Sequence, residues 1–179
     1  AKKMQKVNVG IVGGAGYTGG ELLRILLHHP AVNIGFIHSS SHAGRRVTDV
    51  HLDLLGDTDL EFEEQFSDDD IDLLVLCSGH GHSTRFFAEH EVKPGLRIID
   101  LSQDFRIESP GHFRPFVYGL PEAGTDLVRK AQNVANPGCF ATAIQLGLLP
   151  LAMEGALHHD VHVTAVTGST GAGQTPTAT

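Results

Sequence analysis

The chain has 179 residues, of which 41% are hydrophobic, enough for one full domain with a core and the start of another. Its formal net charge is -8 with histidine neutral. Nucleic-acid binding is therefore disfavoured, because proteins of that class usually carry a basic face.

Neither a secretory signal nor a membrane-spanning segment is predicted. The apolar run that follows the basic N-terminus is too short for a signal, and no later run reaches spanning length. Two cysteines, Cys77 and Cys139, are too few for a disulfide framework. We therefore expect free thiols in a reducing compartment and a cytoplasmic protein without a membrane partner.

The first hundred residues alternate between strand and helix patterns. Buried-strand patterns cover residues 7–12, 32–37, 71–77 and 97–101, and helix patterns cover residues 18–28 and 83–90. Strands that alternate with helices are typical of a doubly wound parallel sheet, so the sequence predicts an α/β fold.

The remainder of the chain is less regular. Residues 102–134 are rich in Pro, Gly and aromatic residues and are interpreted as a functional loop region. An apolar helix is expected at residues 140–149, an alternating strand at 161–167 and a glycine-rich loop at 168–173. The last residues do not resemble the end of a finished domain, so a truncated chain is expected.

Cys139 is the candidate nucleophile. It follows the Pro137-Gly138 turn and precedes the apolar stretch, so its thiol is expected at the first turn of a helix. Unpaired backbone N–H groups and the positive end of the helix dipole stabilise a thiolate at such a position. A buried, inert cysteine is the alternative interpretation.

The turn after the first strand pattern is rich in glycine. Gly14, Gly16 and Gly19 fit the G-x-G-x-x-G spacing, and Gly13, Gly16 and Gly19 fit a looser one. Glycine lets the backbone turn tightly and admits a pyrophosphate to the N-terminus of the following helix. The sequence thus predicts a dinucleotide site here, with a purely structural turn as the alternative.

The end of the second strand pattern distinguishes NADP from NAD. NAD sites usually place Asp or Glu there, to bind the ribose 2′-hydroxyl group. This chain instead has Ser39, Ser40 and Ser41, followed by Arg45 and Arg46. Hydroxyl groups and cations suit a 2′-phosphate, so NADP(H) is predicted, and a solvated polar loop is the alternative.

Five segments carry a resemblance to a known family. They are GGAGYTGGEL at residues 13–22, DLSQDFR at 100–106, YGLPE at 118–122, NPGCFAT at 136–142 and GSTGAG at 168–173. In this order they resemble the N-acetyl-γ-glutamyl-phosphate reductases of arginine biosynthesis. The chain departs from the family pattern at Gly168, where serine is commoner, and at Ala141, where proline is common.

The resemblance implies a Rossmann-type, NADP-binding domain at residues 1–155 that carries the catalytic Cys139. The start of an α+β catalytic and dimerisation domain would follow at residues 156–179. The implied reaction is NADPH-dependent reduction of an acyl phosphate to an aldehyde through a thioester on Cys139, in a homo-oligomer. The family's catalytic histidine is expected beyond residue 179, so none of the 12 histidines is given that role.

The expected site residues follow from the motifs and the resemblance together. Arg106 is a candidate clamp for a phosphate or carboxylate, with an ion pair to Asp104 or Glu108 as the alternative. Asn136 and Ser102 are expected at the nicotinamide and substrate end, although both residue types are also common in turns and caps. The expected cofactor-binding residues are Gly13, Gly16, Tyr17, Thr18, Gly19, Ser39, Ser41, Arg45, Cys77, Ser78, Gly79 and Ser102.

Two further points bound the interpretation. The short histidine clusters at residues 28–29, 80–82 and 158–162 lack a matching ligand set, so no metal site is predicted. Cys77 is expected to contact the dinucleotide through backbone atoms while its thiol packs in the core.

The alternatives to the predicted reductase are an aspartate-β-semialdehyde dehydrogenase-like enzyme and a non-catalytic nucleotide-sensing domain.

Overall fold

The structure is a computed structural model that describes residues 5–107, 114–168 and 171. Two sequence predictions concern other residues. Glu108, the alternative partner of Arg106, lies outside the described residues, as does most of the predicted loop at 168–173.

Six parallel strands form one sheet, in the order β2-β1-β3-β4-β6-β5. Their bounds are β1 Val7–Val12, β2 Val32–His38, β3 Leu73–Leu76, β4 Arg97–Asp100, β5 Val117–Tyr118 and β6 Asn133–Ala135. β2 lies on one side of β1, and β3 and β4 follow on the other side of β1, so the direction in which the chain adds strands reverses after β2. This reversal is the mark of a doubly wound fold, so the predicted class is confirmed.

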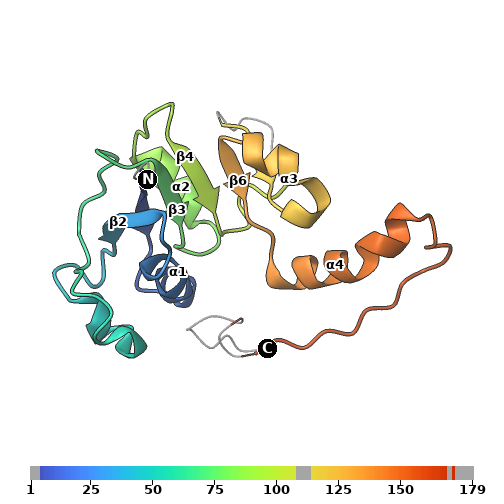
Figure 1. Cartoon of the computed structure of the whole chain (residues 1–179), viewed down its shortest axis with the longest axis horizontal. Coiled ribbons are helices and arrows are strands. Elements are labelled where there is room, and N and C mark those ends of the chain that lie inside the picture. The colour runs from blue at the N-terminus through green and yellow to red at the C-terminus, as the bar shows by residue number, and fades with distance from the viewer. Residues whose placement is uncertain (1–4, 108–113, 169–170, 172–179) are drawn as a thin grey trace.

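Both faces of the sheet are covered by apolar side chains. On β1, Val9 and Ile11 join one core cluster and Val12 joins the other, because successive side chains of a strand point to opposite faces. The first cluster includes Leu23 of α1 (Tyr17–Leu27), and the second includes Phe86 of α2 (His82–Glu89). The two helices therefore pack on opposite faces of the sheet (Figure 1).

Short helical turns follow β2. η1 (Val47–Asp49) and η2 (Leu52–Leu54) place Val47 and Leu54 in the first core cluster. Between them, His51 is buried, and its Nε2 lies 2.8 Å from the Gly14 carbonyl oxygen. This contact ties the segment after β2 to the turn after β1.

The prediction of an irregular region at residues 102–134 is wrong for much of that stretch. The structure places β5, α3 (Pro121–Lys130) and most of β6 there. α3 is hard to detect from sequence because it is interrupted at Gly124, whose φ of -165° and ψ of 57° are not helical, and because none of its residues is buried. β5 and β6 have only two and three residues, too few for a readable alternation.

The last described element is α4 (Cys139–Met153), which starts at Cys139 as expected and continues through Pro150. It extends away from the sheet, and none of its residues is buried (Figure 1). The predicted strand at residues 161–167 is wrong for the described chain, where this stretch is exposed and has no regular structure. No described strand pairs with it, and a lone strand leaves its backbone groups without ladder partners.

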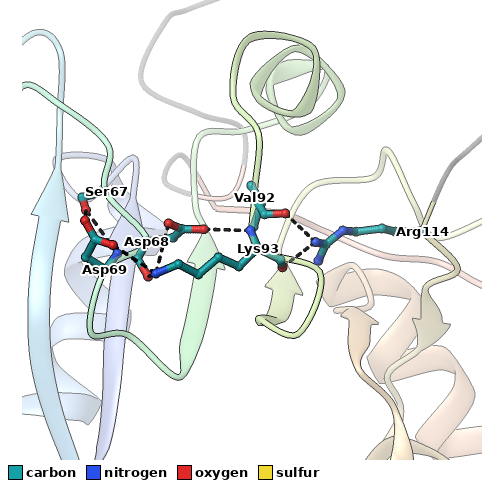
Figure 2. Close-up of polar contacts among 6 residues, drawn as sticks. All are labelled: Ser67, Asp68, Asp69, Val92, Lys93 and Arg114. Atoms are coloured by element: carbon teal, nitrogen blue, oxygen red, sulfur yellow. Dashed lines mark hydrogen bonds and ion pairs between the residues drawn. The ribbon is translucent and has the colours of Figure 1, made fainter.

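A polar clamp joins loops at the amino ends of the strands (Figure 2). Lys93 donates from its backbone N–H to the Asp68 carboxylate at 2.7 Å, and its Nζ reaches Asp69 at 3.1 Å. Arg114 donates to the carbonyl oxygens of Lys93 at 2.7 Å and Val92 at 2.9 Å. The clamp lies at the sheet edge opposite to the one that bears the predicted site residues. Among the described helices, none is both long and apolar enough to cross a membrane.

Candidate functional site

Parallel strands bring the segments that follow them to one edge of the sheet. The glycine turn follows β1, Cys77 and Ser78 follow β3, Ser102 follows β4, and Cys139 lies four residues after β6. A cleft with a volume of about 610 Å³ opens at this edge, where the strand order reverses between β1 and β3. In doubly wound folds, this is the position where ligands bind.

Half of the predicted cofactor residues line this cleft. They are Gly13, Gly16, Ser39, Ser41, Cys77 and Ser78. A second wall, which the motifs did not predict, comes from α2 with His82, Arg85, Phe86 and Glu89, together with the following His90. The spacing of Arg85 and Glu89, four apart on a predicted helix after β3, was the available signal.

Protein packing explains two of the motif glycines. Gly13 has a φ of +81°, and a Cβ there would lie 2.7 Å from the Ser78 backbone nitrogen. A Cβ on Gly19 would lie 2.6 Å from the Gly14 carbonyl oxygen. These two positions therefore need glycine for the turn to pack against β3 and for α1 to pack against the turn.

Gly16 differs from these glycines. It is the N-cap residue of α1, with a φ of -78° that any residue can adopt. Among the described residues, a Cβ there would meet only the Gly13 carbonyl oxygen, at an ordinary 3.7 Å. Packing thus gives no reason for glycine at this cleft-lining position, whereas close approach of a ligand to the helix N-terminus does.

The segment after β2 contributes serines but not Arg45. The carbonyl oxygen of His38 accepts hydrogen bonds from the N–H groups of Gly13 and Gly14, both at 3.1 Å, which fixes this strand end against the glycine turn. Ser39 is buried, and Ser41 is exposed with its Oγ 2.8 Å from the His42 ring. Arg45 is exposed and does not line the cleft.

The end of β3 is held by α1. Thr18 donates from its hydroxyl group to the Cys77 carbonyl oxygen at 3.3 Å, so the structure gives Thr18 a packing role. Burial raises the pKa of the Cys77 thiol to about 12, and the nearby Asp100 adds to this effect. Cys77 is therefore a neutral core residue. Tyr17 and Gly79 are exposed and do not line the cleft.

Ser102 lies below the surface of the site. It is 1% exposed, and its hydroxyl group donates to the buried Asp100 carboxylate at 2.6 Å. Ser83, at the start of α2, donates to the same carboxylate. Asp100 thus fixes the loop after β4 to the N-terminus of α2, and the Ser102 side chain faces this network and not the cleft.

Asp104 caps α2 from the same loop. It accepts from the N–H groups of Gly81 at 2.7 Å and Thr84 at 3.0 Å, where the helix has no cap of its own. Burial acts to raise the pKa of Asp104, but the hydrogen bonds from Thr84 and Gly81 outweigh it and hold the pKa below its ordinary value. Asp104 is therefore engaged with α2, and no ion pair between it and Arg106 occurs among the described residues.

Arg106 instead braces the loop that carries Cys139. Its Nε donates to the Asn136 carbonyl oxygen at 2.8 Å, and another guanidinium nitrogen donates to the Leu101 carbonyl oxygen at 3.0 Å. A Cβ on Gly138 would lie 2.9 Å from a guanidinium nitrogen, so the cation rests directly over that residue. The backbone N–H of Asn136 donates to the Asp100 carbonyl oxygen at 2.8 Å, which anchors the same loop to β4.

Cys139 is exposed, has a free thiol and is the first residue of α4. The N-cap Gly138 provides no side-chain cap, so the first-turn N–H groups keep their positive potential. Cys139 does not line the cleft. Since β6 is three strand positions from β1, the cysteine loop and the glycine turn are separated by roughly 14 Å, a distance that an extended ligand can bridge.

Histidines occur in the cleft without a metal-binding arrangement. Burial lowers the pKa of His38. A backbone contact with Glu64 acts to raise this pKa, and the neighbouring His90 acts to lower it, so that the pKa stays below its ordinary value. Within the part of the chain that the structure describes, no three His, Cys, Asp or Glu side chains are grouped to hold a metal ion.

The parallel sheet, the glycine turn and the cleft at the switch point define a dinucleotide-binding domain of the Rossmann type. Residues 8–131 match the family model "Semialdehyde dehydrogenase, NAD binding domain", and residues 139–179 match "Semialdehyde dehydrogenase, dimerisation domain". The chain belongs to the semialdehyde dehydrogenase family.

Curated relatives with high identity are N-acetyl-γ-glutamyl-phosphate reductases. The protein from Bacteroides thetaiotaomicron is 56% identical over 97% of this chain and 53% of its own length. That from Azobacteroides pseudotrichonymphae is 54% identical over 96% of this chain and 54% of its own length. The chain therefore spans about half the length of the curated relatives it matches.

Solved structures show the same fold. Aspartate semialdehyde dehydrogenase II from Vibrio cholerae has a TM-score of 0.61 at 22% identity, over 83% of this chain and 48% of that protein. The Candida albicans aspartate semialdehyde dehydrogenase, solved with NADP, has a TM-score of 0.60 at 17% identity, over 85% of this chain and 48% of its own.

Proposed function

We propose that this chain is part of an N-acetyl-γ-glutamyl-phosphate reductase, which uses NADPH to form N-acetylglutamate semialdehyde and phosphate. The observation that carries the proposal is the position of Cys139. An exposed thiol begins a helix at the same sheet edge that holds the dinucleotide cleft. The names of relatives at 50–56% identity supply the substrate.

The residues at the cleft fit a dinucleotide. Gly16 lines the cleft, and packing against the described residues gives no reason for glycine there. The glycine turn and Ser78 would hold the pyrophosphate, and the serines after β2 would face the adenosine ribose. β2 ends in His38 followed by Ser39, without the carboxylate of an NAD site, which supports NADPH. When bound, NADPH supplies the hydride for the reduction.

Cys139 performs the covalent chemistry in this proposal. Its thiolate attacks the γ-carbonyl carbon, a C–S bond forms, and the bond to the phosphate oxygen breaks, so that phosphate leaves with the electron pair. The product of this step is a thioester on Cys139. After reduction, the C–S bond breaks, the aldehyde is released and the sulfur returns to its anionic form. No described histidine is assigned as the acid or base.

Arg106 has two roles in the proposal, to position the cysteine loop and to bind an anion. It holds the cysteine loop through Asn136, and a guanidinium nitrogen over Gly138 has no described acceptor. That nitrogen is available to a phosphate or carboxylate at the loop, as the clamp hypothesis requires.

Replacing Cys139 with serine tests the nucleophile. In the complete enzyme, Cys139→Ser should abolish NADPH oxidation and phosphate release with the acyl phosphate, while NADPH binding is retained. Cys77, the other thiol, is buried in the core and stays unchanged in this variant, so a loss of turnover reports on Cys139. Substantial turnover of Cys139→Ser would refute the assignment.

The remaining parts of the proposal concern assembly, domain boundaries and compartment. An apolar α4 without a buried residue, within the segment that matches a dimerisation domain, supports a homo-oligomer. We propose that residues 1–155 form the NADP-binding domain and that α4, where the dimerisation-domain match begins, is its last element, with the substrate and oligomerisation domain continuing from residue 156. A reactive free thiol suits the reducing cytoplasm. An aspartate-β-semialdehyde dehydrogenase-like activity is the second candidate, supported by the shared fold alone.

A further inference from the structure

We propose that Arg85, on α2, binds the 2′-phosphate of NADP, and that Glu89 holds its guanidinium when no phosphate is present. This inference rests on the proposed NADP site and adds the residue that selects NADP over NAD. Neither the glycine motif nor the segment after β2 contains this residue.

The first argument is the composition of the two walls of the cleft. One wall is the end of β2, with Ser39, Ser40 and Ser41, where an adenosine ribose lies in doubly wound folds. The other wall is α2, which contributes Arg85. Hydroxyl groups and a guanidinium that share one cleft form a suitable site for a phosphate dianion, because arginine can donate two parallel hydrogen bonds to it.

The second argument concerns the other cations near the end of β2. Arg45 and Arg46 are exposed, and neither lines the cleft. The backbone of this segment is committed to an antiparallel bridge between Arg46 and Glu61 and to a bond from the Phe62 N–H to the Arg45 carbonyl oxygen. Arg85 is therefore the arginine that the cleft provides among the described residues.

The third argument is the pair with Glu89. The Arg85 Nε lies 2.6 Å from the Glu89 carboxylate, one helical turn away, and the two side chains are 71% and 50% exposed. An exposed pair at this spacing contributes little stability, so a dianionic phosphate can displace the carboxylate. The other charged or titratable side chains in the cleft are Glu64, Cys77, His38, His82 and His90. Glu89 thus acts as a weak internal competitor of the phosphate.

Equilibrium binding of NADPH and NADH to the complete enzyme tests the inference, with nicotinamide fluorescence as the readout. Arg85→Gln should weaken NADPH binding about tenfold and leave NADH binding within about twofold, since NADH has no 2′-phosphate. Glu89→Gln should tighten NADPH binding about twofold to threefold by removing the competitor. The non-fluorescent nucleotide 2′,5′-ADP should displace NADPH from the wild type and should displace it much less from Arg85→Gln.

Arg129→Gln is the matched control. Arg129 is 73% exposed and pairs with Asp126 three residues away on α3, so the variant makes the same charge change outside the cleft. It should bind both nucleotides as the wild type does. If the wild type prefers NADPH and Arg85→Gln keeps that preference, or if Arg45→Gln loses it instead, the inference is overturned and the NADP assignment stands. If the wild type shows no preference for NADPH, both are overturned.

Discussion

Alanine at Gly13 should lower the stability of the domain and alanine at Gly16 should weaken NADPH binding, although both glycines belong to the same turn. At Gly13, with a φ of +81°, a left-handed conformation costs alanine about 1–2 kcal/mol. The new Cβ would lie 2.7 Å from the Ser78 nitrogen and 2.8 Å from the Cys77 carbonyl carbon. Because these are backbone atoms, relief requires a shift of the strand end, at a further cost of about 1–3 kcal/mol.

The expected loss for Gly13→Ala is therefore about 2–5 kcal/mol, a large part of the stability of an ordinary domain. Gly16→Ala should change stability by less than about 1 kcal/mol. Its φ of -78° and the 3.7 Å contact are unstrained, and the entropy gain of alanine roughly offsets its weaker performance as an N-cap. Its effect should appear in NADPH binding, because Gly16 lines the cleft at the N-terminus of α1.

Urea unfolding followed by circular dichroism measures the first quantity, and fluorescence titration with NADPH measures the second. Gly16→Ala should unfold near the wild-type midpoint and bind NADPH at least tenfold more weakly, and Gly13→Ala should unfold at markedly lower urea. A Gly16→Ala variant that lost more than about 2 kcal/mol, or that bound NADPH normally, would refute the distinction between packing and ligand glycines.

Three other results are expected. Arg114→Met should lower the free energy of unfolding by about 1.5–3 kcal/mol in urea titrations, because charge-assisted bonds to backbone carbonyl oxygens are lost at the clamp of Figure 2, and NADPH binding should not change. Asp104→Asn should destabilise the domain at neutral pH. Since folding lowers the pKa of Asp104, the difference from the wild type should vanish as the pH falls through that folded-state pKa, and a difference that persisted in acid would contradict the capping role. Ellman's reagent at pH 8 should modify only Cys139 in the native chain and also Cys77 after unfolding, because burial raises the pKa of Cys77 to about 12, and two native thiols would contradict this.

The fold was predictable wherever an element is long and its pattern depends on its own residues. β1, α1, β2, α2, β4 and the start of α4 lie within one or two residues of their expected bounds. α3, β5 and β6 were missed because an interrupted helix and strands of two or three residues carry almost no periodic signal. The strand expected at 161–167 failed for a different reason, since alternation describes a strand only where a partner strand exists.

The site shows the same division. Sequence by itself determined the glycine turn, the cysteine that begins α4 and the absence of a carboxylate after β2, because each depends on residue types at fixed local spacing. Tertiary structure alone decided which residues share a cleft. Arg85 lines the cleft and the predicted Arg45 does not. The Ser102 hydroxyl group donates to Asp100, and the Arg106 guanidinium lies over Gly138. The physical reason is that these contacts join segments far apart in the chain, and parallel pairing of the strands brings those segments to one edge of the sheet.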